Sequence, residues 1–520
     1  MKNNLILILF SITTFGFSQN YIPDPAFGTN GAIVTNYNMY YDNDQAPSNC
    51  FYVNNKYIFT QKTQLSAFNY DGSINFNFGT LGYSRLADPS LSYNILSSKL
   101  IDNYIYLMGV KTNGYDIRLG FVAKMSVDGI LDGSFGSNGI SVFSIGTTIN
   151  TGSTTNEKSG VYDLVLKDGA IFVVGTTYFS TTTEWERMFV SKLTLNGTID
   201  TTFDTNGYKT YPYSQDGMGK AIFSYENDLL LVADGKNYYY GVPSYQTSKV
   251  LMKIDENGNY VTSFGVNGIK KINICSGCGG SAERINKITI NGIYLYMLTT
   301  HSEASPFGWS KVQKVNIETL ETTNIASADY SGNGNYLVDN DKIYIIGCNN
   351  YPNATSDCPF DFNLAKRNLD GTLDLSFNQT GLYNFNFNNA TSSIDRATVL
   401  IKHTDGKIMM AGYTQNGTQT TAPNKGFAIA RIGDILLNNN NFDTQNDFSL
   451  ASNPVKSILN IVNVKNLIIE KISISDVLGK IVYEKRGNNA IINVEELING
   501  IYFITIFSND KTEFLKFIKN

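Results

Sequence analysis

The chain has 520 residues, 42% of them hydrophobic, and carries a formal net charge of −5 at pH 7 with a pI near 5.3. A surface that binds nucleic-acid phosphates needs Lys and Arg gathered on one face, so this charge argues against a nucleic-acid partner. The 33 Tyr, 31 Phe and 45 Gly, beside only 11 Pro, favour many short strands and tight turns over helices. The length exceeds what one hydrophobic core organises, so we expect more than one domain.

The N-terminal segment has the pattern of a cleavable export signal. Lys2 precedes an apolar stretch over residues 5–17, and small residues stand at Gly16 and Ser18. The stretch is too short for a membrane span, which needs about 20 apolar residues, and no later segment qualifies as a transmembrane segment. We therefore expect residues 1–18 to be a signal peptide that directs the chain to the periplasm.

A short apolar run recurs along the chain, followed each time by a second strand-like run and often by an Asn-Gly or Asp-Gly turn. The continuous apolar character of the first run predicts a strand buried on both faces. The partial alternation of the second run, as at 120–125 and 188–193, predicts a strand nearer solvent. The seven first runs are residues 57–59, 104–109, 170–175, 229–233, 293–297, 342–347 and 407–412.

A Phe followed four residues later by Gly comes after many of these turns. The six pairs are Phe27 and Gly31, Phe78 and Gly82, Phe135 and Gly139, Phe203 and Gly207, Phe264 and Gly268, and Phe377 and Gly381. The last interval is about twice the others, so we place a degenerate copy near residues 318–330 and count seven units.

The phase of the repeat predicts a closed ring. The chain begins with an isolated Phe27 and Gly31 and ends its last unit near Ile432 without such a pair. An N-terminal strand that completes the last blade would hide exposed sheet edges. We therefore expect an all-β fold: a seven-bladed β-propeller over residues 21–434, followed by a small C-terminal antiparallel β-sandwich. The alternative, a linear solenoid, would need polar capping units at both ends.

Three segments share the pattern Asp-x-Ser/Thr-Phe, or a close variant of it, after the turn: residues 131–139, 199–203 and 373–377. They resemble the delta-60 repeat of bacterial surface and secreted proteins. The resemblance covers about residues 21–434 and implies a propeller-like scaffold. It carries no settled activity.

Residues 435–447 read as a linker, with four Asn in a row at 438–441, and period-two alternation over residues 448–520 predicts the small sandwich. Four motifs in this segment contain Asn453, Pro454, Gly479, Lys480, Gly500, Tyr502, Lys516 and Lys519. In this order they resemble the type A C-terminal sorting domain of the type IX (Por) secretion system of Bacteroidetes, with Ser452 where the family usually has Pro. The resemblance implies type IX machinery as a partner and a location in the medium or on the outer cell surface. The alternative is a merely adhesive β-sandwich.

Catalytic motifs are missing from the sequence. It holds no nucleophile elbow, phosphate loop, H-E-x-x-H or EF-hand pattern, and only two histidines. We expect both to be loop residues without a catalytic role: His301 follows an apolar run, and His403 precedes a turn. No metal site or cofactor is predicted, although calcium at the Asp-Gly loops stays open. Glycosidase chemistry needs only two carboxylates, so a carbohydrate-active hydrolase or lyase also stays open.

Aromatic residues between the strand runs are the better lead to function. Trp185, Tyr238, Tyr239, Tyr240 and Trp309 fall where exposed rings can stack on sugars or pack into a protein interface. The alternative is that they cover neighbouring blades. We expect a secreted or cell-surface binding propeller without enzymatic activity, with a glycan or a protein as ligand. Beside the hydrolase or lyase, a structural surface-layer component is the weaker alternative.

The five cysteines suit an oxidising compartment. Cys348 with Cys358, and Cys275 with Cys278, are candidate disulfides, and Cys50 is left over. A metal or redox site at Cys275 and Cys278 is the alternative to a local disulfide. A zinc site would want a second Cys/His pair at ligand spacing, which the two histidines do not supply.

Overall fold

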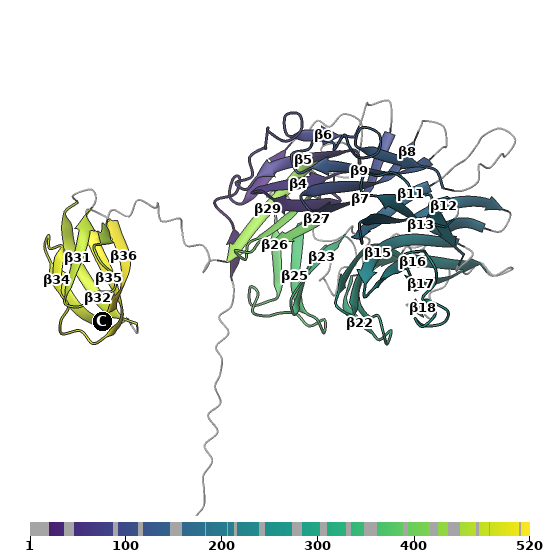
Figure 1. Cartoon of the computed structure of the whole chain (residues 1–520). Coiled ribbons are helices and arrows are strands. Elements are labelled where there is room, and N and C mark those ends of the chain that lie inside the picture. Colours follow the sequence, from purple (N-terminus) through teal and green to yellow (C-terminus); the bar gives the residue numbers. More distant parts are fainter. Residues whose placement is uncertain are drawn as a thin grey trace, which may run out of the picture. The chain divides into compact units, whose positions relative to one another are not determined.

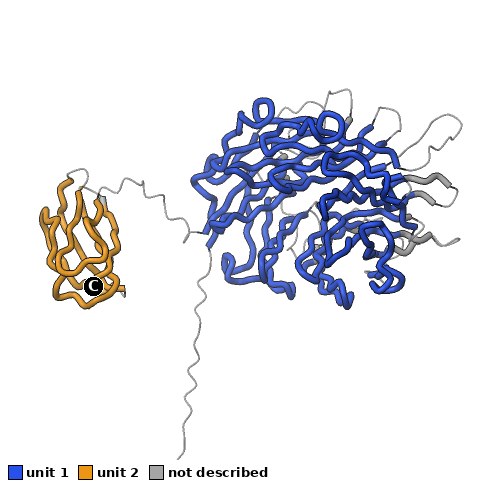
Figure 2. Tube along the Cα trace, viewed as in Figure 1, with its two compact units in different colours: residues 1–437 blue, residues 438–520 orange. Residues whose placement is uncertain are grey.

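The structure is a computed structural model. It describes residues 20–35, 46–86, 92–112, 118–145, 159–181, 184–204, 206–212, 216–238, 245–272, 283–301, 309–328, 334–347, 361–387, 394–415, 425–434, 448–463, 467–477, 479–508 and 511–520. The chain divides into two compact units, Met1–Leu437 and Asn438–Asn520, which are coloured separately in Figure 2. In the part of the chain so described, no helix is long and apolar enough to cross a bilayer.

Unit 1 is a succession of seven antiparallel sheets, which we call blades 1 to 7 in chain order (Figure 1). Blade 1 contains β3 (Asn49–Val53), β4 (Lys56–Thr60), β5 (Gln64–Asn69) and β6 (Tyr83–Arg85), and blade 2 contains β7 (Ser92–Ile101), β8 (Tyr104–Thr112), β9 (Arg118–Ser126) and β10 (Ile140–Phe143). Blade 3 contains β11 (Ser159–Lys167), β12 (Ala170–Thr181), β13 (Glu184–Thr194) and β14 (Tyr208–Tyr211), and blade 4 contains β15 (Asp216–Tyr225), β16 (Asp228–Tyr238), β17 (Tyr245–Ile254) and β18 (Ile269–Ile272). Blade 5 contains β19 (Glu283–Asn291), β20 (Tyr294–His301), β21 (Trp309–Asn316) and β22 (Thr322–Ala328), and blade 6 contains β23 (Asn335–Asp339), β24 (Lys342–Ile346), β25 (Phe362–Asn368) and β26 (Leu382–Phe385).

Blade 7 joins the two ends of the repeat. It contains β27 (Ile394–Lys402), β28 (Ile408–Gln415) and β29 (Lys425–Asp434), and β29 also pairs with the N-terminal strands β1 (Tyr21–Pro23) and β2 (Ala32–Thr35). Ala32 lies opposite Ala430, and Tyr21 lies opposite Asp434. The prediction of a closed propeller whose last blade is completed by the N-terminal strand is confirmed.

Blade 5 keeps its fourth strand although it lacks the Phe and Gly pair. A short turn joins β21 directly to β22, with the Asn316 N–H donating to the Glu321 carbonyl at 2.9 Å and Leu320 at a φ of 63°. The degenerate copy near residues 318–330 therefore falls where it was expected, because strand pairing along β22 survives the loss of the turn motif.

Burial differs from the expectation for the third strands. Phe121, Val122 and Ala123 of β9 are fully buried, as are Phe189 and Val190 of β13. The prediction that these strands lie nearer solvent was wrong. Each third strand is flanked by the second and fourth strands of its own blade, and side chains of adjacent blades cover its faces.

The Phe-Gly motif clasps one blade to the next. The N–H of Gly136, directly after Phe135, donates to the carbonyl of Asn196 in the following blade at 2.7 Å. The Phe135 ring is fully buried and lies against Gly197, where an added Cβ would come within 2.8 Å of its Cζ. Blades 7, 1 and 2 each repeat the hydrogen bond to the blade that follows: Gly28 to Asp71 at 2.8 Å, Gly79 to Asp128 at 2.8 Å, and Gly136 to Asn196.

The aspartate of the same motif makes its hydrogen bonds and its ion pair within its own blade. Asp132 Oδ1 accepts hydrogen bonds from the Ser134 N–H at 3.1 Å and hydroxyl at 2.6 Å, and Oδ2 pairs with Lys124 Nζ at 2.8 Å. Lys124 and Ser134 lower the pKa of Asp132 to about 2. Asp200 with Lys192, and Asp374 with Lys366, repeat the arrangement, so these carboxylates stabilise turns.

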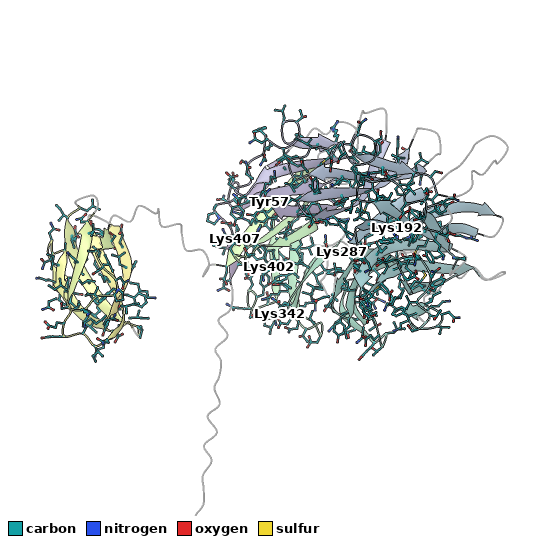
Figure 3. All side chains as sticks on the ribbon, viewed as in Figure 1. Tyr57, Lys192, Lys287, Lys342, Lys402 and Lys407 are labelled. Atoms are coloured by element: carbon teal, nitrogen blue, oxygen red, sulfur yellow. The ribbon has the colours of Figure 1, made fainter. Side chains whose placement is uncertain are left out.

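A belt of polar contacts links all seven blades, and most of its members belong to the first strands. Lys287 stands in it at the blade 5–6 junction, where Nζ donates to Asn335 Oδ1 and, at 2.8 Å, to the Tyr336 carbonyl (Figure 3). Burial lowers the pKa of Lys287 to about 8. The other junctions, in order from blades 6–7 onward, are Asn335 Nδ2 to the Thr398 carbonyl at 2.8 Å, Thr398 Oγ1 to the Pro47 carbonyl at 2.6 Å, Asn49 Nδ2 to the Ser98 carbonyl at 3.0 Å, Lys99 to Asp163 at 2.7 Å, the Ile222 N–H to Asp163 at 3.0 Å, and the Ile285 N–H to Asp234 at 3.1 Å.

Unit 2 packs two small antiparallel sheets around one core. The sheets are β30 (Phe448–Leu450), β31 (Ile458–Asn463) and β34 (Ile491–Asn493), and β33 (Ile481–Arg486), β32 (Ile469–Asp476), β35 (Gly500–Ser508) and β36 (Lys511–Lys519). The core includes Leu459, Ile474, Ile504, Ile506 and Phe517, all with no exposed surface. Alternation along β35 puts every second residue into this core.

Candidate functional site

The two ends of the propeller differ in the connections they carry. Because consecutive strands of a blade are antiparallel, first-to-second and third-to-fourth connections meet at one end, which we call the turn end. Second-to-third connections and connections between blades meet at the opposite end, the loop end. First-to-second connections are tight turns, as at Asn54 and Asn55, which have φ of 49° and 58°. Third-to-fourth connections have a nearly constant length, with 13 residues in blades 1, 2, 3 and 6 and 14 in blade 4, and they carry the Phe-Gly motif. Within blades, loop-end connections range from 2 residues between β12 and β13 to 15 between β24 and β25.

Three of the predicted aromatic residues belong to the loop end, but they are not in loops. Trp185 is the second residue of β13, Tyr238 is the last residue of β16, and Trp309 is the first residue of β21. The expectation that these three fall between strands was wrong, because the hairpins extend further than the apolar runs. Tyr239 and Tyr240 lie outside the described residues.

A cluster of cations surrounds Tyr162 at the loop end, and we call Arg118, Tyr162, Lys220 and Arg284 the loop-end cluster. Tyr162, Lys220 and Arg284 come from the first strands of blades 3, 4 and 5, and Arg118 begins the third strand of blade 2. Lys220 Nζ lies 5.1 Å from the centroid of the Tyr162 ring. Nothing in the sequence pattern distinguished these residues.

β-bulges place two members of this cluster. Pairing between β11 and β12 shifts register between Val161 and Asp163, which leaves Tyr162 as the extra residue. Pairing between β15 and β16 shifts between Gly219 and Ala221, which leaves Lys220 in the same role. The signal that could have found them is structural, because a bulge breaks the period-two rule on which a sequence prediction rests.

Two carboxylates at the loop end are candidates for the enzymatic alternative. Burial raises the pKa of Asp361, which directly precedes β25, and burial together with Asp361 raises the pKa of Asp395 in β27. Asp395 is 2% exposed and accepts hydrogen bonds from the Thr414 hydroxyl at 2.5 Å and the Phe387 N–H at 3.3 Å. Asp395 is therefore already engaged in holding strands together.

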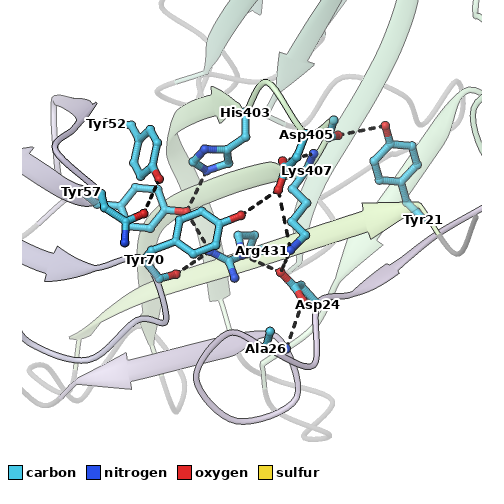
Figure 4. Close-up of polar contacts among 12 residues, drawn as sticks. Tyr21, Asp24, Ala26, Tyr52, Tyr57, Tyr70, His403, Asp405, Lys407 and Arg431 are labelled. Atoms are coloured by element: carbon cyan, nitrogen blue, oxygen red, sulfur yellow. Dashed lines mark hydrogen bonds and ion pairs between the residues drawn. The ribbon is translucent and has the colours of Figure 1, made fainter. Parts of the chain in front are cut away.

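The second polar cluster closes the ring at the turn end, between blades 7 and 1 (Figure 4). Arg431 of β29 has no exposed surface, and its Nε donates to Asp24 Oδ2 at 2.7 Å. Lys407 Nζ lies 3.1 Å from the same oxygen. The guanidinium carbon also lies 4.0 Å from the centroid of the Tyr70 ring in blade 1. Burial raises the pKa of Asp24, but the Ala26 N–H, Arg431 and Lys407 outweigh it and leave this pKa below its usual value.

His403 belongs to this closure cluster. Its Nε2 lies 2.7 Å from the Tyr57 hydroxyl, which also accepts a hydrogen bond from Arg431 Nη1 at 3.1 Å. Burial lowers the pKa of His403 to about 4, so the ring is neutral at pH 7. Tyr57 is fully buried and His403 is 7% exposed. The cluster contains residue types that are common in catalytic sites, but Tyr57 and His403 are too buried to contact a substrate. We therefore assign the cluster a structural role.

The predicted sorting residues of unit 2 converge in space. Asn453 Nδ2 donates to the Lys516 carbonyl at 3.1 Å, and its Oδ1 accepts from the Ile518 N–H at 2.9 Å, so the second residue of the Ser-Asn-Pro motif is bound to the terminal strand. Val455, next to Pro454, forms an isolated parallel β-bridge with Lys519. Gly500 lies opposite Lys519 across β35 and β36.

Tyr502 connects the remaining motifs. It lies opposite Phe517 on β36 and opposite Asp476 at the end of β32, and its ring stacks on Phe517 at 5.5 Å between centroids. Asp476 Oδ1 accepts from the Lys480 N–H at 3.0 Å, which shapes the turn that contains Gly479 at a φ of 83°. These contacts thus connect four motifs that are spread over about 70 residues of sequence.

The predicted disulfides, and the alternative metal or redox site at Cys275 and Cys278, stay untested. Cys275, Cys278, Cys348 and Cys358 lie outside the described residues, and Cys50 is a free thiol buried in blade 1. Within the described ranges, no three His, Cys, Asp or Glu side chains are grouped so as to hold a metal ion.

Comparisons with known proteins found several solved structures that are similar to this chain, at TM-scores of 0.36 to 0.41 and 9–10% sequence identity. An oligogalacturonate lyase in complex with manganese is 10% identical over 80% of this chain and 98% of its own, with a TM-score of 0.41. The WD40 domain of Neurospora crassa Pan2 is 9% identical over 79% and 94%, with a TM-score of 0.36.

A third structure is only partly spanned. It is an extracellular domain from B. thetaiotaomicron assigned to the hybrid two-component system BT4673, with 10% identity, a TM-score of 0.37 and coverage of 93% of this chain and 58% of that one. No curated protein matches the chain. Residues 452–520 match the family model of the secretion system C-terminal sorting domain. Unit 2 is therefore a type IX sorting domain, and the protein is exported by the type IX system to the outer surface or the medium.

Proposed function

We propose that the exported protein is a binding propeller without enzymatic activity, which takes a glycan or a protein at its loop end. The observation that carries the proposal is the difference between the two ends. Clasps and tight turns occupy the turn end, whereas the variable connections and the strand ends with Trp185, Tyr238 and Trp309 belong to the loop end. Variable connections on a rigid scaffold are where binding residues usually reside. The belt and the closure cluster supply that rigid scaffold.

The repeated turn-end clasp also supports the resemblance of residues 21–434 to delta-60 repeats. In blades 2, 3 and 6 the Asp of the motif pairs with a Lys of the third strand, and in blade 7 Asp24 pairs with Arg431. The units therefore repeat in structure as well as in sequence, because they share both the strand pattern and these side-chain contacts. On this scaffold, the residues of the loop end determine which ligand binds.

A carbohydrate-active hydrolase or lyase is the second candidate, and Asp361 and Asp395 favour it. Their raised pKa values are a feature of general acids. Asp395, however, already accepts hydrogen bonds from Thr414 and Phe387. It is therefore not available as the second catalytic carboxylate beside Asp361. We therefore rank the enzyme below the binding module, and the surface-layer component below both.

One experiment separates these candidates. The full chain is incubated with a panel of polysaccharides and host glycoproteins, and bound protein and released products are measured in the same wells. Saturable binding without products is expected. Trp185→Ala and Trp309→Ala should weaken it, whereas Phe76→Ala, at a turn-end position that is 64% exposed, should not. Products that disappear in Asp361→Asn would establish the enzyme, and self-assembly without any ligand would establish the structural role.

A further inference from the structure

The loop-end cluster has an unusual cation at its centre. The Lys220 side chain is 13% exposed, and its nearest carboxylate oxygen, Asp234 Oδ2, lies 3.9 Å away. Among the described residues no hydrogen-bond acceptor serves its ammonium group, which has three N–H donors. A largely buried ammonium group without hydrogen bonds is costly, so this position is maintained at the expense of stability.

Asp234 is shared between Lys220 and two closer partners. Asp234 Oδ1 pairs with Lys249 at 2.6 Å, where the Lys249 side chain is 1% exposed, and Oδ2 accepts the Ile285 N–H at 3.1 Å. Lys249 and Asp234 therefore cancel each other. Burial lowers the pKa of Lys220, and the nearby charges of Lys249 and Arg284 lower it further, although Asp234 and Glu186 act in the opposite direction.

The charge balance around Tyr162 is positive. Arg284 directly precedes Ile285, whose N–H donates to the Asp234 oxygen that lies 3.9 Å from Lys220. Burial raises the pKa of Tyr162, Glu186 raises it further, and Arg118 and Arg284 lower it. Among the side chains that the structure describes, and with the Lys249 and Asp234 pair set aside, Arg118, Lys220 and Arg284 are balanced by one carboxylate, Glu186. The protein as a whole has a net charge of −5, so this local excess of two positive charges is a deviation from the average surface.

The donors of the cluster point to one kind of ligand chemistry. Lys220 offers an ammonium group, Arg284 an exposed guanidinium with a planar fork of donors, and Tyr162 a hydroxyl for which no described residue is a partner. A carboxylate or sulfate group accepts from all three, and a charged acceptor makes each hydrogen bond stronger than a neutral one does. A neutral sugar would leave the positive charge uncompensated.

We propose that the loop-end cluster binds the anionic group of an acidic glycan, with Lys220 and Arg284 as the main donors and Tyr162 as an additional one. The inference rests on the proposed binding function and specifies its ligand class. The carboxylate of a uronic acid and a sulfate ester share the chemistry that this site recognises. The loop-end aromatic residues would then contact the sugar rings beyond the charged group.

The test is titration of the full chain with three oligosaccharides of equal length: an oligomer of glucuronic acid, a sulfated oligosaccharide and an oligomer of glucose. Binding of one or both acidic oligomers is expected, with no measurable binding of the glucose oligomer. The affinity for the acidic oligomer should fall at least tenfold between 50 and 200 mM salt if several ionic contacts form. The oligomer that binds more tightly identifies the source of the anionic group.

Variants locate the site. Lys220→Gln and Arg284→Gln should each weaken binding of the acidic oligomer about tenfold or more, and Tyr162→Phe should weaken it less. Lys271→Gln, at an exposed position on the outer strand β18, is the matched control and should bind as the unaltered chain does. Arg284 is exposed, so Arg284→Gln keeps the fold and decides the question even if Lys220→Gln does not fold.

Two results would overturn the inference. Acidic binding that is unchanged in both Arg284→Gln and Lys220→Gln places the anion elsewhere. Binding of a neutral glycan or a protein, but of no acidic oligomer, refutes the ligand class and leaves the binding propeller intact. Absence of binding to every glycan and glycoprotein removes both proposals together.

Discussion

Arg431 and Asp24 stand 407 positions apart in the chain and meet in the interior, with Arg431 Nε 2.7 Å from Asp24 Oδ2. Neither side chain is exposed by more than 1%. Asp24 follows the N-terminal strand β1, and Arg431 lies in β29 of the last blade, so this ion pair fastens the strand that closes the ring. The closure of the propeller depends on charge pairing as well as on strand pairing.

Asp24→Asn should destabilise the propeller by about 3–5 kcal/mol, because it leaves the buried guanidinium of Arg431 without its counter-charge. The free energy of unfolding is measured by urea titration of the full chain. Glu484→Gln in unit 2 is the control: it breaks an exposed pair with Lys471 at 2.7 Å and should change stability by less than about 1 kcal/mol. An equal, small effect of both substitutions would contradict the role of the ion pair.

The stability of the propeller should fall in mild acid because of His403. Its pKa is about 4 in the folded protein and about 6.5 in the unfolded chain, so below pH 6.5 the unfolded chain binds a proton that the folded protein does not. The contribution is fully present above pH 6.5 and is lost progressively as the pH falls toward 4. Between pH 7 and 4.5 the chain should lose about 2–3 kcal/mol more than His403→Gln. Parallel pH profiles of the two proteins would refute the assignment.

Lys287 should produce a slope of the same sign in mild alkali. Its pKa of about 8 lies below that of an unfolded lysine, so between pH 8 and 10.5 the unfolded chain holds more protons. Stability therefore rises with pH in this window, by about 2 kcal/mol between pH 7.5 and 9.5 relative to Lys287→Gln. Chemical denaturation of both proteins at the two pH values measures the difference. No difference would mean that the ammonium group is hydrated and not buried.

The blade clasp can be tested with two glycines that share one backbone conformation. Gly197 has a φ of 81° and lies under the Phe135 ring, whereas Gly169 has a φ of 77° and no atom within 4 Å of its added Cβ. Gly169→Ala should cost about 1–2 kcal/mol from backbone strain alone. Gly197→Ala should cost about 1–3 kcal/mol more, because its methyl group collides with the ring. Equal losses in thermal unfolding of the two variants would show that the ring moves aside freely.

Export should depend on the packing of Tyr502. Tyr502→Ala removes its stacking on Phe517 and the hydrogen bond from its hydroxyl to the Ile498 carbonyl at 2.8 Å, at a cost of about 3–5 kcal/mol. We expect the variant to be retained in the periplasm of a secretion-competent host, as measured by cell fractionation. Ile458→Ala, which is 57% exposed and outside the four motifs, should be exported normally. Normal export of Tyr502→Ala would separate the sorting signal from the fold of the domain.

Much of the scaffold could be predicted from local patterns. Seven apolar runs gave the seven blades, and the isolated Phe27 and Gly31 gave the closure by the N-terminal strand, because both depend on strand periodicity and turn residues that are written within each unit. The motifs around Asn453 and Tyr502 gave the sorting domain and the export route. The degenerate unit of blade 5 could be counted because its strand runs survive without the turn motif.

Other features were beyond reach of these patterns. The alternating pattern of the third strands predicted that they are half-exposed. Such a pattern describes a single strand and contains no information about the neighbouring blades that cover it. Trp185, Tyr238 and Trp309 were placed in loops because the hairpins continue past their apolar runs, held by backbone pairing that polar residues satisfy equally well. Tyr162 and Lys220 attracted no attention because each is the extra residue of a bulge.

The sequence by itself determined the all-β repeat, its closure and its export, since each follows from short-range periodicity and turn chemistry or from a compact set of motifs. Only the tertiary structure decided which charges meet. Arg431 finds Asp24, and Lys220 finds Tyr162, through ring closure and blade packing, which bring together side chains from different strands. Burial and neighbouring charges then set the pKa values of His403 and Lys287, and these depend on the folded surroundings rather than on residue type.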